Sequence, residues 1–116
     1  MSIKRGEIWL ASLDPTKGSE QAGTRPVIVF QNESISKFTI TVIAIPLTTN
    51  LKRADLPTCV LIPENENPVK NDSVALCHQM RVLDKTRLIH KTGELSNETL
   101  KKIDKCVLFT LGIVNI

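Results

Sequence analysis

The feature that most constrains the fold of this chain is a series of short apolar runs, rich in β-branched residues and separated by turn-forming residues. Runs of this length and composition are typical of strands in a small β domain. The runs that we expect to form strands are Gly6–Ser12, Pro26–Gln31, Thr39–Leu47, Pro57–Ile62 and Ser73–Leu83, with a further short strand at Arg87–Lys91. Because few residues join most of these runs, they favour a small, twisted sheet that closes on itself.

The final segment changes from the period of a strand to the period of a helix. Its apolar residues at helical spacing are Leu100, Ile103, Val107, Leu108 and Leu111. Ser96 is a suitable N-cap, Glu98 places negative charge in the first turn, and Gly112 can end the helix. The fold class that follows is mainly β, a β-barrel-like α+β domain with one C-terminal helix.

The composition indicates one domain with an aliphatic core. The chain has 116 residues, of which 41% are hydrophobic, but it contains only three Phe, one Trp and no Tyr. A chain of this length is expected to form a single domain, here residues 1–116. No segment approaches the roughly 18–20 apolar residues that span a bilayer, and the start, MSIKRGEIW, is not the apolar stretch of a signal peptide. We therefore expect no association with a membrane.

The three cysteines, Cys59, Cys77 and Cys106, are far apart in the sequence, and none belongs to a Cys-x-x-Cys pair. An odd number of such cysteines favours free thiols in a reducing cytoplasm over a disulfide framework. A zinc site would need histidine or acidic residues at ligand spacing, and the sequence has no evident arrangement of that kind. We therefore predict a cytoplasmic protein without a metal ion or other cofactor.

The net charge of +3 comes from the first half of the chain. Residues 1–53 contain seven basic and four acidic residues, whereas the remaining residues contain eight of each. A mildly basic surface is compatible with a polyanionic partner such as RNA, but charge by itself is weak evidence for one.

Arg25 stands where the polar stretch GSEQAGT meets the apolar run that starts at Pro26. Proline disfavours the helical conformation of the residue before it, so Arg25 is expected to be extended on a stiff backbone. A guanidinium group is planar, always charged and able to offer paired donors to a phosphate. Two roles stay open from these residues alone: a phosphate ligand, or a salt bridge to Glu20 or another carboxylate.

Hydroxyl side chains follow the third expected strand in the sequence Thr48-Thr49-Asn50. Such hydroxyls can donate to the oxygens of a phosphate. They can equally stabilise a turn through hydrogen bonds to their own backbone.

The run Ser73–Leu83, taken as one strand, places alternate side chains on opposite faces. One face would carry Ala75, Cys77, Gln79, Arg81 and Leu83, and the other Val74, Leu76, His78, Met80 and Val82. Gln79 and Arg81 form a polar pair that could read a base edge, hold a phosphate or only face solvent. His78 shares its face with aliphatic residues, which favours a half-buried, hydrogen-bonded histidine over a catalytic one, and His90 is expected to be exposed.

The sequence lacks the common signatures of nucleotide-binding, metal-dependent and serine-nucleophile enzymes. It has no HExxH, GxxxxGK[ST] or GxSxG motif and no Asp-rich metal loop. Cleavage of RNA is compatible with this absence, because the nucleophile is the 2′-hydroxyl of the substrate, already held beside the phosphorus. The protein would need only to position the strand, move protons and stabilise a pentacoordinate phosphate. A ribonuclease built on two histidines as acid and base is poorly supported.

Blocks of residues along essentially the whole chain resemble one known family. They are RGEIWLASLDP (5–15), GSEQAGTRPVIV (18–29), TVIAIPLTT (41–49), DSVALCHQMRVLDKTRL (72–88) and FTLGI (109–113). Their order and spacing resemble the MazF/PemK family of toxin endoribonucleases, and most of all its Gram-positive MazF type. The block GSEQxGxRP is far more specific than a lone short motif.

The resemblance implies a fold, an activity and partners. The fold would be a small SH3-like barrel related to CcdB and PemK, in a homodimer whose RNA groove follows the subunit interface. The activity would be that of a type II toxin: sequence-specific, metal-independent cleavage of single-stranded RNA, mRNA included, to give a 2′,3′-cyclic phosphate and a 5′-hydroxyl. A MazE-type antitoxin would occupy the groove and block it.

The resemblance also implies roles for individual residues. The arginine of the Arg-Pro step and the first threonine after the third strand are the family's catalytic pair, and they correspond to Arg25 and Thr48. The RNA-binding residues that it implies, together with the polar pair noted above, are Ser19, Glu20, Thr49, Leu56, Gln79 and Arg81. This chain has His78 at the position where many relatives carry Glu. A role of that glutamate in positioning RNA or in pH dependence therefore cannot be assigned to this chain.

Two alternatives to the ribonuclease hypothesis remain at this point. One is a CcdB-like toxin of the same fold that binds DNA gyrase without catalysis, although residues 112–116 contain no recognisable gyrase-binding determinants. The other is an SH3-like binding module in which the Thr24-Arg25-Pro26 and Leu47-Thr48-Thr49 junctions are only turns.

Overall fold

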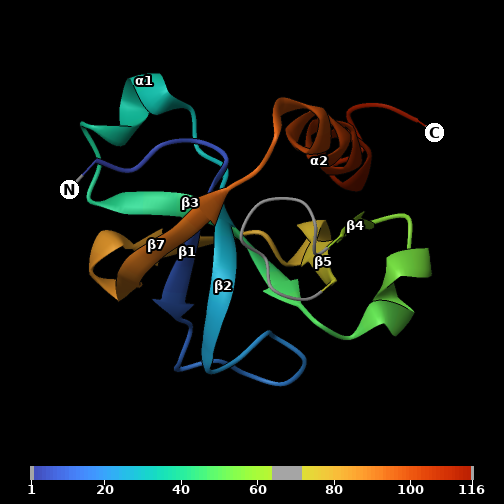
Figure 1. Ribbon diagram of the computed structural model, residues 1–116, viewed down its shortest axis with the longest axis horizontal. Coiled ribbons are helices and arrows are strands. Elements are labelled where there is room, and N and C mark those ends of the chain that lie inside the picture. The colour runs from blue at the N-terminus through green and yellow to red at the C-terminus, as the bar shows by residue number, and fades with distance from the viewer. Residues whose placement is uncertain (1, 64–71, 116) are drawn as a thin grey trace.

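The computed structural model describes residues 2–63 and 72–115, which form mainly antiparallel strands (Figure 1). The strands are β1 (Glu7–Ser12), β2 (Thr24–Val29), β3 (Thr41–Thr48), β4 (Cys59–Ile62), β5 (Ser73–Leu76), β6 (Arg81–Asp84) and β7 (Leu88–Glu94). The helices are α1 (Glu33–Ser36) and α2 (Asn97–Thr110), with the short 3₁₀ helices η1 (Leu51–Asp55), η2 (Cys77–Gln79) and η3 (Lys85–Arg87). All six expected strand regions therefore contain strands, whereas α1 and the 3₁₀ helices were not predicted.

The strands form one sheet in the order β4-β5-β3-β2-β1-β7, and β6 pairs with β3 off this path. Every strand pair is antiparallel. Within the described residues β4 and β7 are the ends of the path and do not pair with each other, so the sheet is barrel-like but not closed. The predicted fold class, mainly β with a C-terminal helix, is confirmed, while complete closure of the sheet is not observed.

The hydrophobic core lies on both faces of the central strands. Ile28 of β2 and Ile45 and Leu47 of β3 share one cluster with the buried residues of α2. Their neighbours Val27 and Ala44 face a second cluster that contains Trp9. Val27, Ile28 and the next residue, Val29, are fully buried, which confirms the prediction that the apolar run after Pro26 is covered on both faces.

The run Ser73–Leu83 is not one strand, and this prediction was wrong. β5 and β6 both pair with β3, with Ala75 opposite Leu47 and Arg81 opposite Ala44. Ala75 and Arg81 are six positions apart, whereas their partners on β3 are three positions apart, so the run contains three additional residues. These are the residues of η2, which turns the chain between β5 and β6. The insertion breaks the period of two: consecutive residues of β5 are buried, whereas His78 is exposed and not half-buried as expected.

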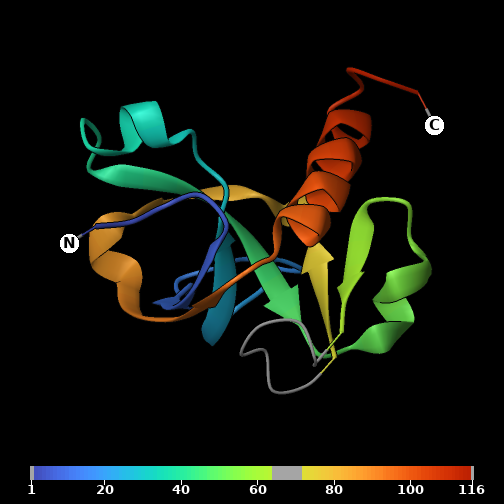
Figure 2. The same cartoon turned by 45° about the horizontal axis from the view of Figure 1, so that its top comes forward.

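Helix α2 packs over the sheet beside β4, β5 and η2 (Figure 2). Ser96 is its N-cap and accepts a hydrogen bond from the Thr99 amide at 3.2 Å, as predicted. Gly112, with φ of 76°, follows the last turn and confirms the predicted end of the helix. The predicted apolar stripe is shorter than expected: Leu100, Ile103 and Val107 pack on the core, but Leu108 and Leu111 are exposed. No helix in the described ranges is long and apolar enough to cross a membrane.

A buried carboxylate fixes the start of β1. Glu7 accepts hydrogen bonds from the Lys4 amide at 2.8 Å and from Trp9 Nε1 at 3.0 Å, and it forms a 3.0 Å ion pair with Lys91 of β7. Burial raises the pKa of Glu7, but the hydrogen bonds and the charge of Lys91 outweigh it, so the pKa lies below its usual value. The preceding residue, Gly6, has φ of 90°, and a Cβ there would lie 3.2 Å from Leu100 of α2.

Candidate functional site

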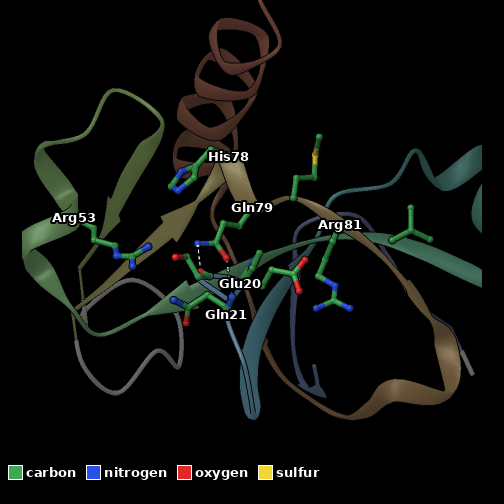
Figure 3. A pocket seen from close by; sticks show the side chains of 10 residues that line it. Glu20, Gln21, Arg53, His78, Gln79 and Arg81 are labelled. Carbon is green, nitrogen blue, oxygen red and sulfur yellow. Dashed lines mark hydrogen bonds between the residues drawn. The ribbon is translucent and has the colours of Figure 1, made fainter. Parts of the chain in front are cut away.

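A cavity of about 720 Å³ opens between the β1–β2 loop, η1 and η2. Its lining residues are Ser19, Glu20, Gln21, Pro46, Arg53, His78, Gln79, Met80, Arg81 and Val82. Figure 3 shows Glu20 and Gln21 on the loop facing Gln79, with Arg53 entering from the side of η1. The cavity brings together four of the predicted RNA-binding residues, which are far apart in the sequence: Ser19, Glu20, Gln79 and Arg81.

Arg25 lies in β2 beside this cavity's loop but does not line the cavity. Its side chain is exposed, and its Nε donates a 3.1 Å hydrogen bond to the carbonyl of Ala22. Within residues 2–63 and 72–115 the guanidinium takes part in no ion pair, so the salt bridge to Glu20 that the sequence left open is not observed. Glu20 instead accepts a hydrogen bond from the Lys17 amide at 2.6 Å. The two terminal nitrogens of Arg25 are therefore directed at no described protein acceptor.

Thr48 ends β3 and is buried, with 7% of its surface exposed. Its hydroxyl oxygen accepts a 3.2 Å hydrogen bond from the amide of Asn50. The turn-stabilising role that the sequence left open for these hydroxyls is therefore observed in part, through this contact with Asn50. In the same turn the Asn50 side chain caps η1. Because a hydroxyl can accept and donate at the same time, the proton of Thr48 is still available to an acceptor outside the turn.

The register of β2 and β3 places Arg25 and Thr48 at the same end of the two strands. The last paired position is Val27 opposite Pro46. Arg25 lies two residues before Val27, and Thr48 lies two residues after Pro46, so both fall at the same end of adjacent antiparallel strands. Since side chains alternate along a strand, both also lie on the face that carries Val27 and Pro46. Pro46 lines the cavity, which makes this strand end continuous with it.

Gln79 and Arg81 are engaged with the β1–β2 loop. The side-chain oxygen of Gln79 accepts from the Gln21 amide at 2.8 Å, and its nitrogen donates to the Ser19 carbonyl at 3.3 Å. Arg81 Nη1 donates to the carbonyl of Leu13 at 3.3 Å, at the start of the same loop. The polar pair predicted from the sequence therefore contacts the loop backbone.

Arg53 and His78 border the cavity, although sequence analysis did not predict a role for either in binding. The Nδ1 of His78 forms a 2.9 Å hydrogen bond with the hydroxyl of Thr58, which orients the ring, and Arg53 lies in η1, five residues after Thr48. The sequence contained little indication that Arg53 lines a cavity, because no local pattern predicted that η1 would lie across the cavity from η2. Two predicted residues, Thr49 and Leu56, are exposed on either side of η1 and do not line the cavity.

The three cysteines are free and buried. Burial raises the pKa of the Cys59 and Cys77 thiols, and for Cys77 the neighbouring Cys106 raises it further. Such thiols are protonated and unreactive near neutral pH. In the described part of the chain no three histidine, cysteine or acidic side chains are placed to hold one metal ion. His90, in β7, is exposed as predicted.

Comparison with known proteins gives a consistent result for sequence and fold. The family model described as PemK-like, MazF-like toxin of type II toxin-antitoxin system matches residues 4–111. Endoribonuclease MazF of Staphylococcus saprophyticus is 39% identical over 111 residues, which are 96% of this chain and 92% of that protein. The sequence similarity therefore extends over both proposed catalytic positions and over every residue that lines the cavity.

Solved structures share the fold at lower sequence identity. A crystal structure of MazF (Form-I) from Deinococcus radiodurans superposes with a TM-score of 0.82 at 24% identity, covering 97% of this chain and 98% of that one. An endoribonuclease in complex with its cognate antitoxin, from a mycobacterial species, superposes with a TM-score of 0.78 at 24% identity and covers 95% of both chains. At this level of identity the two structures support the fold alone.

Proposed function

The chain belongs to the PemK-like, MazF-like family of toxins of type II toxin–antitoxin systems, and we propose that it is a sequence-specific endoribonuclease that cleaves single-stranded RNA, mRNA included. We take residues 1–116 as one toxin domain. The observation that carries the proposal is 39% identity, over 96% of the chain, to a relative named as an endoribonuclease. The position of Arg25 and Thr48 at one strand end, beside a polar cavity, supports it.

The proposed reaction is an attack of the RNA on itself. The 2′-hydroxyl gives its proton to solvent water and its oxygen bonds to the adjacent phosphorus. The bond from phosphorus to the 5′-oxygen breaks, and that oxygen takes a proton from Arg25, which solvent then replaces. The products are a 2′,3′-cyclic phosphate and a 5′-hydroxyl. The atoms and electrons of this reaction balance without an oxidant, cofactor or metal ion, because the nucleophile and the leaving group both belong to the RNA.

Arg25 would stabilise the negative charge that develops on the pentacoordinate phosphate and donate the proton to the leaving oxygen. Its Nε is held by Ala22, which leaves the terminal nitrogens to form paired hydrogen bonds with phosphate oxygens. A guanidinium is an unfavourable general base, since it stays charged at any pH near neutrality. This role therefore depends on donation and charge, not on proton removal.

Thr48 would donate its hydroxyl proton to a non-bridging phosphate oxygen. The amide of Asn50 occupies an acceptor position of this hydroxyl and orients it. Because Thr48 is buried, the donor is rigid and little reorganisation is needed when charge develops.

The cavity would bind the nucleotides that flank the cut. Ser19 and Glu20 present hydroxyl and carboxylate groups from the loop, and Arg53 adds positive charge from the opposite side. Thr49 and Leu56, both exposed near η1, would contact RNA outside the cavity. Gln79 and Arg81 complete the set of proposed RNA-binding residues, and both also support the loop.

Two protein partners belong to the proposal. A MazE-type antitoxin would bind over the groove, as expected for a toxin of a type II system. A second copy of the chain would form a homodimer, with the RNA groove along the interface. The exposed apolar side chain of Val82, which borders the cavity, supports an interface on this side.

The experiment that tests the proposal is incubation of the purified chain with mixed-sequence single-stranded RNA in the presence of EDTA. We expect discrete fragments that end in a cyclic phosphate. Intact RNA, with inhibition of DNA gyrase in a parallel supercoiling assay, would support the CcdB-like alternative instead. Intact RNA without gyrase inhibition would point to a binding module.

A further inference from the structure

The β1–β2 loop, residues 13–23, is held at its base and at its tip by different contacts. At the base, Arg81 donates to the Leu13 carbonyl, and Arg87 of η3 donates to the carbonyls of Ser12 and Asp14. The two sides of the loop join where the Leu13 amide donates to the Gly23 carbonyl at 2.9 Å. These contacts fix where the loop leaves the sheet, but they do not reach residues 19–21.

The tip of the loop is connected to the rest of the described chain through one side chain. Gln79 binds it on both sides of Glu20: its oxygen accepts from the Gln21 amide at 2.8 Å, and its nitrogen donates to the Ser19 carbonyl at 3.3 Å (Figure 3). The orientation of this amide is determined by its partners, because a reversed amide would place its nitrogen against an N–H group. Ser19 and Glu20 are exposed, Gln21 is partly buried, and the other hydrogen bonds of the tip stay within the loop, between Lys17 and Glu20.

We propose that Gln79 is a positioning residue that fastens the tip of the β1–β2 loop to η2 and thereby fixes the width of the RNA-binding cavity. The loop residues Ser19, Glu20 and Gln21 form one wall of this cavity, and His78, Gln79 and Met80 form the facing wall. The Gln79 amide is the hydrogen-bonded link between the two walls. This inference rests on the proposed function for its role in RNA binding, whereas the link itself can be tested without RNA.

The competing role for Gln79 is direct recognition of a base. In the chain without RNA each of these two atoms already has one partner in the loop, so reading of a base edge would use the second lone pair of the oxygen and the second N–H of the nitrogen, and it would not require the loop contacts. In the proposed role, Gln79 acts through Ser19 and Glu20. Its loss should therefore change the loop even when no RNA is present.

The most direct test is the exchange rate of single backbone amides with water, measured by NMR on the full chain without RNA. Gln79→Met removes both hydrogen bonds, and we expect the Gln21 amide to exchange about tenfold faster, because a neutral hydrogen bond changes an opening equilibrium roughly two- to tenfold. Gln79→Glu keeps the acceptor and should stay within about threefold of the wild type. The Gly23 amide, bonded to Asp14 at 3.1 Å, serves as an internal reference that should not change.

Gln21→Met is the matched control. Its side chain lines the same cavity but forms no hydrogen bond to the described residues, and its backbone amide is unaltered. We expect the exchange of the amide at position 21 to stay within about twofold of the wild type. A loss of protection as large as that in Gln79→Met would mean that general loop order, and not the Gln79 link, protects this amide, and would overturn the proposal.

The kinetic readout separates the two roles of Gln79. A loosened tip should raise KM for a single-stranded RNA substrate. We expect a smaller change in kcat, because the hydrogen bond between Leu13 and Gly23 still holds the loop beside Ala22, whose carbonyl binds Arg25. If Gln79→Met raises KM but leaves the Gln21 amide unchanged, Gln79 contacts RNA directly and the proposal is wrong. If the exchange difference is found but the wild-type chain cuts no RNA, the link stands and the proposed ribonuclease function fails.

Discussion

At the scale of single residues, Arg25 illustrates how an exposed arginine can be prepared for a charged ligand. Within the described residues its side chain has no carboxylate partner, and the one hydrogen bond that the side chain forms there joins Nε to a backbone carbonyl. Pro26 stiffens the backbone behind it. A guanidinium that is fixed at one edge and open at the other suits paired donation to a phosphate.

Substitution of Arg25 tests whether this paired donation is needed. We expect Arg25→Lys to lower the cleavage rate by about 10²-fold or more, since loss of one donor to the transition state costs roughly that much and an ammonium group cannot form the same fork. Arg25→Ala should be at least as defective. Gel assays of RNA cleavage, with circular dichroism as the test of folding, provide the measurement.

The control for this experiment is at Thr48. Thr48→Ser keeps the hydroxyl and should retain most activity, whereas Thr48→Val keeps the shape and should lose activity as Arg25→Lys does. Near-normal turnover by Arg25→Ala would remove Arg25 from the proposed catalytic pair.

Glu7 is the second residue with a predicted effect, and this effect concerns stability. Its pKa is lower in the folded chain than its ordinary value of 4.5, so the proton binds the unfolded chain more tightly. The stabilisation by the Glu7 carboxylate is therefore present above about pH 4.5 and is lost as the pH falls through the folded pKa. We expect Glu7→Gln to lower the free energy of unfolding by about 1–3 kcal/mol at pH 7.

Urea denaturation of the wild type and Glu7→Gln between pH 3 and pH 7 measures this dependence. The difference between the two proteins should shrink below about pH 4.5, because the wild type then loses its carboxylate interactions. A difference that stays constant over this range would show that the ionised form of Glu7 contributes nothing to stability.

At the scale of elements, the sequence predicted what local chemistry determines. The position of α2 followed from Ser96, Glu98 and Gly112, because caps and the helix dipole depend on neighbouring residues. The strand regions followed from β-branched runs in the same way. The sequence could not indicate η2. Its three residues are additional because β5 and β6 pair with different parts of β3. That pairing is a property of the sheet and leaves no local signal.

The N-cap of α2 gives the prediction at this scale. Ser96→Ala removes the acceptor for the Thr99 amide and should lower the free energy of unfolding by about 1 kcal/mol. Ser96→Asp keeps an acceptor and should be close to the wild type. Thermal unfolding followed by circular dichroism measures both variants. Equal stability of Ser96→Ala and Ser96→Asp would show that the cap does not contribute.

At the scale of the whole molecule, the candidate site is assembled from segments that are distant in the sequence. Ser19 and Glu20 come from the β1–β2 loop, while Gln79 ends η2 and Arg81 begins β6. The family resemblance predicted Ser19, Glu20 and Gln79, and the polar pair noted in the run Ser73–Leu83 added Arg81. Neither gave hydrogen-bond geometry, so the contacts of Gln79 and Arg81 with the loop backbone were not foreseen. Arg53 was missed for a related reason: its approach to the cavity depends on how η1 packs, and no local pattern reports that.

The same scale includes the proposed dimer. Val82 is 60% exposed at the edge of the cavity, and an apolar side chain in that position favours burial by a partner. A homodimer should sediment in analytical ultracentrifugation at twice the chain mass of 12.9 kDa. A monomer at concentrations that cleave RNA would contradict a groove formed at the interface.

We propose that this chain cuts RNA through the 2′-hydroxyl of the substrate, with Arg25 and Thr48 stabilising the phosphate. The decisive experiment maps the cut sites on a long single-stranded RNA in EDTA and then repeats the reaction on an oligonucleotide with 2′-deoxyribose at one mapped site. We expect cuts that recur at one short sequence, cyclic phosphate ends and no cleavage at the deoxy position. Cleavage that continues at the deoxy position would show that the 2′-hydroxyl is not the nucleophile.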